Sequence, residues 1–180
     1  MTNRMRTINP DDLLETPEGR IWTPERNAAA WAQCYIALAQ AITDMAGDAR
    51  VILVCGIQGA GKTSWIATQP PVPGVLYFDA ALPGIRHRAK IIAIARDGGA
   101  AIEAVWIDTP LATALARNAG RSPDKVVPAD AIRSVAAQFE GPSLAEGFDR
   151  IRVYSGEPLA LRQDSVTQSG SGLRSSSEGS

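Results

Sequence analysis

The residues with the clearest chemical potential form one glycine-rich stretch, Gly56-Ile57-Gln58-Gly59-Ala60-Gly61-Lys62-Thr63. The stretch fits the spacing G-x-x-x-x-G-K-[ST] at every fixed position. Its glycines allow backbone N–H groups to turn inward around a polyphosphate, because no side chains stand in the way. Lys62 would then reach the outer phosphates, and the Thr63 hydroxyl would bind Mg²⁺. We predict a nucleotide site formed by these eight residues and Ser64.

The segments on either side of the stretch favour this interpretation over a chance glycine turn. Val51–Cys55 is a run of five apolar residues, which is typical of a buried parallel strand. Trp65 and Ile66 give the following helix an apolar start. A phosphate-binding loop stands in the same place, between a buried strand and a helix.

A carboxylate follows the next predicted strand, Val75–Asp79. At the carboxyl edge of a parallel sheet, Asp79 would lie beside the loop, where it could take the proton of a hydroxyl acceptor or hold Mg²⁺ through water. The alternative is a turn or N-cap aspartate. We predict that Asp79 acts as the base, with Lys62 as a second catalytic residue. For Asp108, a capping or turn position is at least as well supported.

Two arginines could neutralise charge on a transferred phosphoryl group. Arg117 and Arg121 are four residues apart, so one helical face can present both, and a polar loop of residues 122–127 follows them as a possible lid. Two solvated arginines at a helix C-terminus are the alternative. Arg86-His87-Arg88 could bind an anionic acceptor, but a solvated basic face is favoured there.

Composition excludes several classes of protein. A length of 180 residues with 45% hydrophobic content indicates a single globular domain. The net charge of −1 provides no overall field toward nucleic acid or an anionic membrane. Cys34 and Cys55 lie in apolar surroundings, which favours buried, reduced thiols and a cytoplasmic location. The N-terminus has no apolar signal-peptide region.

The pattern along the chain predicts an α/β three-layer fold with a parallel sheet. Strands are expected at 51–55, 75–79, 102–108 and 150–154. Helices are expected after the loop, from Pro83, from Thr109-Pro110 with Thr109 as cap, and from Pro128 to Phe139. Residues 1–50 are an extension to this kinase-like domain of residues 1–154: a loose segment to residue 12, a hairpin over Leu13–Trp22, and a helix from the Thr23 cap to about Met45. Residues 155–180 are Ser/Gly-rich and are expected to be a disordered tail.

The run from Val51 to Tyr154 resembles the P-loop kinases of the polynucleotide 5′-hydroxyl kinase type, a broad group that includes zeta-toxin-like kinases. The matching pieces are the loop at 56–63, Asp79-Ala80-Ala81-Leu82, Trp106-Ile107-Asp108-Thr109-Pro110-Leu111, Arg117-Asn118-x-x-Arg121, Val127-Pro128-x-x-Ala131-Ile132, and Phe139-Glu140-x-Pro142-x-x-x-Glu146-Gly147-Phe148-Asp149. The resemblance implies that Arg117 and Arg121 are lid arginines. In those kinases a long segment between the loop helix and the second strand supplies an Asp and an Arg for the acceptor, whereas here residues 64–74 alone separate them.

We therefore expect an enzyme that binds ATP and Mg²⁺ and transfers the γ-phosphoryl group to a hydroxyl acceptor. The acceptor could be a polynucleotide 5′ end or a nucleotide-like small molecule. The alternative is a non-catalytic ATP-binding module that acts on a protein partner through residues 1–50 or the tail. An NTPase switch or motor is less favoured, because no apolar strand ends in Asp-Glu, the usual pairing for activating water.

Overall fold

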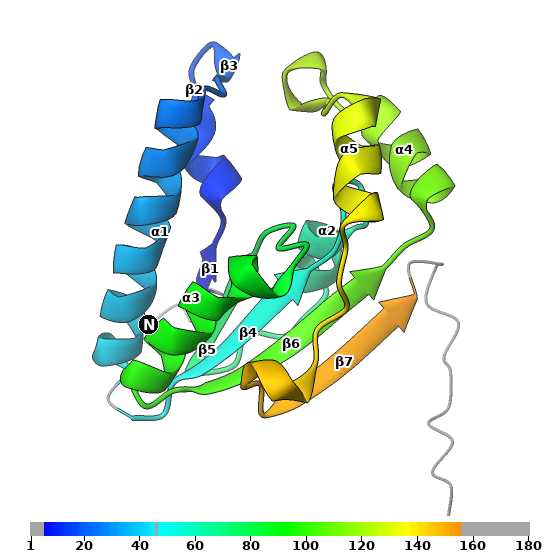
Figure 1. Cartoon of the computed structure of the whole chain (residues 1–180). Coiled ribbons are helices and arrows are strands. Elements are labelled where there is room, and N and C mark those ends of the chain that lie inside the picture. The colour runs from blue at the N-terminus through cyan, green and yellow to red at the C-terminus, as the bar shows by residue number, and fades with distance from the viewer. Residues whose placement is uncertain (1–5, 46, 156–180) are drawn as a thin grey trace, which may run out of the picture.

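The computed structural model describes residues 6–45 and 47–155, and its centre is a five-stranded parallel sheet (Figure 1). The strand order is β1-β5-β4-β6-β7. The strands are β1 Arg6–Ile8, β5 Val75–Asp79, β4 Arg50–Cys55, β6 Ala101–Asp108 and β7 Arg150–Ser155. The predicted strands at 51–55, 75–79, 102–108 and 150–154 are thus confirmed within one residue at each end.

The helices lie on both faces of this sheet, so the predicted α/β three-layer fold is confirmed. They are α1 Pro24–Asp44, α2 Lys62–Ala67, α3 Ile85–Asp97, α4 Leu111–Ala119 and α5 Ala129–Ala137. One hydrophobic cluster joins the sheet to α1 and α3, and another joins it to α2, α4 and α5. Alternation along β4 explains the two clusters, because Val51 and Leu53 enter the first while Ile52 and Val54 enter the second.

The remaining regular elements are short. They are the 3-10 helices η1 Pro10–Leu14, η2 Pro123–Lys125 and η3 Leu144–Glu146, and the hairpin strands β2 Glu15–Thr16 and β3 Gly19–Arg20. The predicted hairpin is therefore confirmed. The predicted cap of α1 is confirmed as well, because the Thr23 side chain accepts a hydrogen bond from the Arg26 N–H.

The N-terminal segment differs from the sequence prediction. Residues 6–12 were expected to be loose, but Arg6–Ile8 pair in parallel with Leu76–Phe78 and form the edge of the sheet. A three-residue strand carries too little periodicity to be recognised, and its pairing with β5 comes from tertiary structure. Residues 1–5 and 156–180 lie outside the described residues. Ser155, predicted to begin the tail, is the last residue of β7.

Two further predictions were wrong in detail. Helix α4 begins at Leu111 with Pro110 in the cap position, so Thr109 does not cap it. Arg88 does not belong to a solvated basic face, because its side chain is fully buried and forms an ion pair with Glu146 at 2.7 Å. The thiols of Cys34 and Cys55 are buried and free, as predicted. None of the helices in the described ranges is long and apolar enough to cross a membrane.

Candidate functional site

The glycine-rich loop connects the carboxyl end of β4 to the start of α2, and two of its glycines are required by close backbone packing. Gly56 has φ +148°, and a Cβ atom there would lie 2.6 Å from the carbonyl oxygen of Ile107. Gly59 has φ +83°, and its Cβ would lie 2.3 Å from the carbonyl oxygen of Ala114. Side chains at these positions would push the loop away from β6 and α4. The loop is therefore built against α4, the helix that carries Arg117 and is followed by Arg121.

The carbonyl oxygen of Ala60 ties the loop to its neighbours. It accepts a hydrogen bond from the Thr109 hydroxyl at 2.9 Å and another from Nη1 of Arg117 at 3.0 Å. Arg117 thus reaches the loop from α4. Thr109, assigned to a cap from sequence, instead holds the loop in place.

Lys62 folds back over the loop. Its Nζ donates to the carbonyl oxygens of Gly56 and Ile57, at 3.0 and 3.2 Å. Burial lowers the pKa of Lys62, while the nearby carboxylate of Asp79 opposes that change. An ammonium group held by two carbonyl oxygens can exchange them for phosphate oxygens with little reorganisation.

Asp79 lies directly beside the loop. It is 2% exposed, and its Oδ2 accepts a hydrogen bond of 2.6 Å from the hydroxyl of Thr63. Burial raises the pKa of Asp79, and the charge of Lys62 and the hydrogen bond from Thr63 oppose that rise. The strand order explains the contact, because β5 is hydrogen-bonded to β4 and both end at the same edge of the sheet.

The oxygen atoms of Thr63 and Asp79 form a set of ligands that suits Mg²⁺. A hydroxyl and a carboxylate are hard oxygen ligands, which Mg²⁺ prefers over nitrogen and sulfur, and it usually takes only one or two protein ligands beside phosphate and water. Thr63 is exposed at the surface of the loop while Asp79 is buried behind it. A cation bound through Thr63 would therefore face solvent and any bound phosphates.

Arg121 belongs to the same electrostatic environment, although its residue is exposed. Its positive charge lowers the pKa of both Lys62 and Asp79. The structure thus brings the loop, Asp79 and Arg117 into contact, whereas Arg121 is exposed and acts through its charge. It leaves Arg86 and His87 exposed on α3 and Asp108 exposed at the end of β6.

Two residues near this site, Asn9 and Asp11, were not predicted from the sequence. Nδ2 of Asn9 forms a long hydrogen bond of 3.4 Å to Oδ2 of Asp79. Oδ1 of Asn9 accepts from the backbone N–H of Asp11 at 2.9 Å. The sequence at residues 9–12, Asn-Pro-Asp-Asp, does carry a signal for a helix start: a cap residue followed by Pro and two acids. Its proximity to the loop depends on β1, which the sequence did not reveal.

The remaining residues of the motif series have structural functions. The side-chain amide of Asn118 donates to the carbonyl of Val127 and accepts from its N–H, which closes the loop between α4 and α5. Glu146 pairs with the buried Arg88. Asp149 accepts from the N–H of Ile102 and pairs with Arg96.

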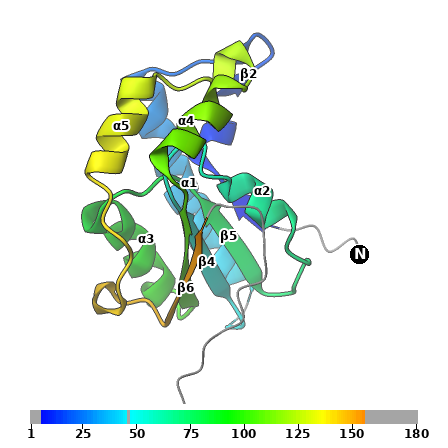
Figure 2. The ribbon, with the colours of Figure 1, turned by 90° about the vertical axis from the view of Figure 1, so that its right-hand side faces the viewer.

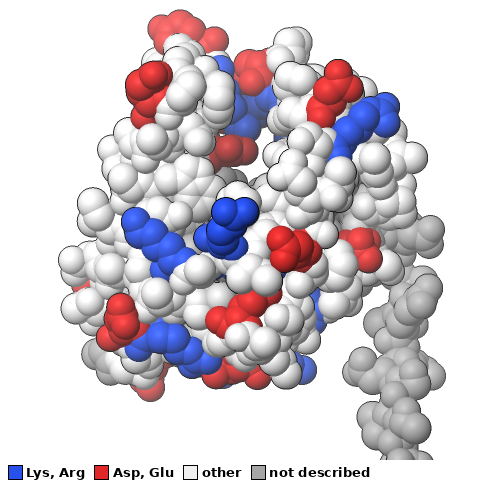
Figure 3. All heavy atoms as spheres, viewed as in Figure 1, with Lys and Arg blue, Asp and Glu red and all other residues white. Residues whose placement is uncertain are grey.

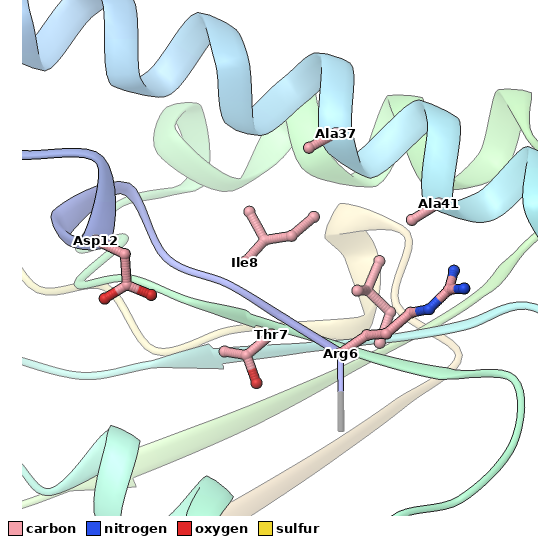
Figure 4. Close-up of a pocket in the computed structure, with 7 residues that line it drawn as sticks. Arg6, Thr7, Ile8, Asp12, Ala37 and Ala41 are labelled. Carbon is pink, nitrogen blue, oxygen red and sulfur yellow. The ribbon is translucent and has the colours of Figure 1, made fainter. Parts of the chain in front are cut away.

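The surface above the loop is hollowed between the α1–hairpin side and the α4–α5 side, with acidic and basic side chains along the hollow (Figure 3). A separate open pocket of roughly 500 Å³ lies between β1 and α1, where Ile8, Ala37, Ala41 and Asp12 line it (Figure 4). This pocket contains none of the loop residues and is distinct from the candidate nucleotide site.

A family model described as AAA domain matches residues 73–142, which run from just before β5 to beyond α5. The match covers less than half of the chain and begins after the glycine-rich loop. No curated protein shows significant similarity to the sequence. The AAA-domain match and the parallel sheet, with its glycine-rich loop between β4 and α2, together identify the fold as that of a P-loop NTPase.

Proposed function

We propose that this protein is an ATP-dependent phosphotransferase that moves the γ-phosphoryl group of ATP to a hydroxyl acceptor. The observation that carries the proposal is the hydrogen bond of 2.6 Å between Thr63 and the buried Asp79, with Lys62 and Arg117 both bound to the same loop. A loop that merely connected a strand to a helix would have no need of a buried carboxylate, because desolvating that group costs free energy.

In this proposal the loop backbone, from Gly56 to Ser64, and Lys62 would hold the phosphates, and Thr63 and Asp79 would hold Mg²⁺. When bound, Mg²⁺ would supply positive charge that offsets the charge of the phosphates. Arg117 and Arg121 stabilise the additional charge that develops on the phosphoryl oxygens during transfer. The contact between Thr63 and Asp79 favours the metal-holding function of Asp79 over the alternative in which it takes the acceptor proton.

The acceptor is proposed from the resemblance to polynucleotide 5′-hydroxyl kinases. It would be a nucleic-acid 5′ end or a nucleotide-like small molecule, and the protein would act in the cytoplasm.

A second candidate is a non-catalytic ATP-binding module that signals to a protein partner. The short connection between α2 and β5, residues 68–74, favours it, because it leaves out the segment that supplies an Asp and an Arg for the acceptor in the resembling kinases. The module would then bind ATP without transferring its phosphoryl group. ATP binding with no phosphoryl transfer to any acceptor would select it.

The test is a transfer assay with γ-labelled ATP and Mg²⁺, in which a 5′-hydroxyl oligonucleotide, a nucleoside mixture and water are offered separately. Lys62→Ala and Asp79→Asn should each abolish transfer, whereas Asp97→Asn, at the exposed end of α3, should not change it. Label on the oligonucleotide supports a polynucleotide kinase, and label on nucleosides alone removes nucleic acid from the proposal. ATP binding without transfer would overturn the enzyme proposal.

A further inference from the structure

The hairpin β2–β3 and the short helix η2 meet across the hollow that lies above the glycine-rich loop (Figure 2). Oε1 of Glu15 lies 3.4 Å from Nζ of Lys125. The backbone N–H of Arg20 donates a hydrogen bond of 3.3 Å to Oδ2 of Asp124. A Cβ atom at Gly19 would lie 3.2 Å from the Cβ atom of Asp124, so the two segments approach closely. We call this meeting the hairpin–η2 contact.

The two sides that the contact joins are each attached to the site below. On the hairpin side, Asn9 precedes η1, and its Nδ2 lies 3.4 Å from Oδ2 of Asp79. On the η2 side, α4 carries Arg117, whose Nη1 donates to the carbonyl oxygen of Ala60 in the loop. The two sides therefore start at or beside the loop and are linked again at their far ends. They flank the hollow, and the hairpin–η2 contact crosses between them (Figure 3).

The hairpin–η2 contact consists of polar groups that can separate at a small cost in free energy. The side chains of Glu15 and Lys125 are 33% and 44% exposed, and ion pairs this exposed contribute little stability. Neither of the two hydrophobic clusters in the described residues includes a side chain of β2, β3 or η2. The hairpin itself is held more firmly, because the guanidinium of Arg20 bonds to both Asp11 and Glu15 at 2.9 Å. The weakest link between the two sides is thus the contact itself.

We propose that the hairpin–η2 contact is a strap over the bound nucleotide, and that its opening sets the rates at which ATP enters and leaves. This inference rests on the proposed ATP site at the glycine-rich loop. A nucleotide on the loop lies between the two sides, so it exchanges with solvent when they part. Because η2 follows α4, a closed contact also keeps Arg117 at the loop. Opening of such a strap limits ligand release in many enzymes that close over their substrates.

The first test locks the contact with a disulfide in the double variant Gly19→Cys/Asp124→Cys. The Cβ separation of 3.2 Å is close to the roughly 3.8 Å found in disulfides, so the two cysteines should bridge on oxidation. Cys34 and Cys55 are buried and should not compete for the bridge. The reduced double variant is loaded with α-labelled ATP and Mg²⁺, then oxidised, and release of the label is followed with and without dithiothreitol.

The oxidised double variant should release the label at least about tenfold more slowly than the same protein after reduction, because the strap can no longer open. Uptake should be slowed similarly when oxidation precedes the addition of ATP. The single variants Gly19→Cys and Asp124→Cys cannot form the bridge and should be insensitive to oxidation. Equal release from the oxidised and reduced double variant, with the disulfide verified by mass spectrometry, would overturn the inference.

The second test weakens the contact without a change at a glycine. Lys125→Ala removes the ion pair with Glu15, and release of labelled ATP should become about two- to fivefold faster, as expected for one exposed ion pair. The matched control is Arg133→Ala, which removes an exposed ion pair within α5 and should leave the rate unchanged. The same rate in Lys125→Ala and the unchanged protein would count against the strap.

The two tests separate this inference from the proposed function. ATP that binds and exchanges at the same rate in all the variants would overturn the strap and leave the ATP site standing. No binding of labelled ATP by the unchanged protein would overturn the proposed function and the strap together. Binding and strap-limited release without transfer to any acceptor would support the strap and overturn only the enzyme proposal.

Discussion

At the scale of single residues, the site depends on a few polar groups placed in partly buried surroundings. The hydroxyl of Thr63 and the carboxylate of Asp79 are 2.6 Å apart, and the pKa of Asp79 is raised by burial. The sequence predicted both residues, because each occupies a recognisable place relative to a strand. It could not show that Asp79 and Thr63 contact each other, since that contact depends on the pairing of β4 with β5.

The hydroxyl of Thr63 should make ATP affinity depend on Mg²⁺. Thr63→Val removes the oxygen ligand but keeps the shape, so affinity measured with Mg²⁺ should fall about tenfold or more, the usual value for a lost contact to a charged partner. Affinity measured in EDTA should stay the same. Thr63→Ser keeps the hydroxyl and serves as the control. Equal loss with and without Mg²⁺ in Thr63→Val would contradict the assignment.

The two thiols should be unreactive in the native protein at ordinary pH. Burial raises the pKa of Cys34 to about 11 and that of Cys55 to about 12. Since a thiol alkylates as the thiolate, native Cys34 at pH 8 should react about a hundredfold more slowly than in guanidinium, where its pKa is normal. Mass spectrometry after iodoacetamide treatment measures this. Rapid alkylation of either thiol in the native protein would show that it is accessible.

At the scale of elements, the loop is shaped by what it packs against. The approach of Gly59 to Ala114 joins the loop to α4, and Thr109 and Arg117 hold the carbonyl of Ala60. The motif predicted the glycines from the need to bind phosphate. The structure adds that packing against α4 requires Gly59 as well, which no spacing rule could have indicated.

Gly59→Ala should therefore cost more stability than another glycine with positive φ. Gly99 has φ +73° with open space around it, so Gly99→Ala measures the backbone cost alone, about 1–2 kcal/mol. Gly59→Ala adds a collision 2.3 Å from the backbone of Ala114, and we expect at least twice that loss in free energy of unfolding. Urea denaturation measures both variants. Equal losses in the free energy of unfolding would contradict a tight contact between the loop and α4.

A buried ion pair connects α3 to the segment before β7. Arg88 and Glu146 have side chains only 0% and 3% exposed, and Arg88 also donates to the carbonyls of Leu82 and Glu140. Arg88→Met leaves the Glu146 carboxylate without its partner, and we expect a loss of about 3–5 kcal/mol in the free energy of unfolding.

The matched control is Arg133→Met, which breaks an exposed pair with Asp130 and should cost less than about 1 kcal/mol. From the sequence, Arg88 was expected to be solvated, because a basic triplet at the start of a helix usually faces solvent. Its burial follows from the fold of residues 140–147 over α3. A loss for Arg88→Met as small as that for Arg133→Met would contradict a structural function of the pair.

At the scale of the whole molecule, the hairpin and the loop before α5 meet above the sheet edge that carries the site (Figure 2). Glu15 pairs with Lys125 at 3.4 Å, and the N–H of Arg20 donates to Asp124. These contacts join the N-terminal extension to the segment that follows α4.

The sequence predicted the parallel sheet, its later four strands and the hairpin, because these depend on local pattern. It missed β1 and η1, because their placement depends on pairing between segments about 70 residues apart.

The central claim is that the loop at 56–63 binds ATP, and equilibrium binding measured by calorimetry tests it most directly. Lys90→Ala, on the exposed face of α3, is the control for Lys62→Ala. We predict one ATP site per chain in the presence of Mg²⁺, with affinity unchanged in Lys90→Ala and weakened at least about tenfold in Lys62→Ala, as expected for a lost charge-assisted contact to phosphate. No ATP binding by the unchanged protein, or equal binding by Lys62→Ala, would contradict the account.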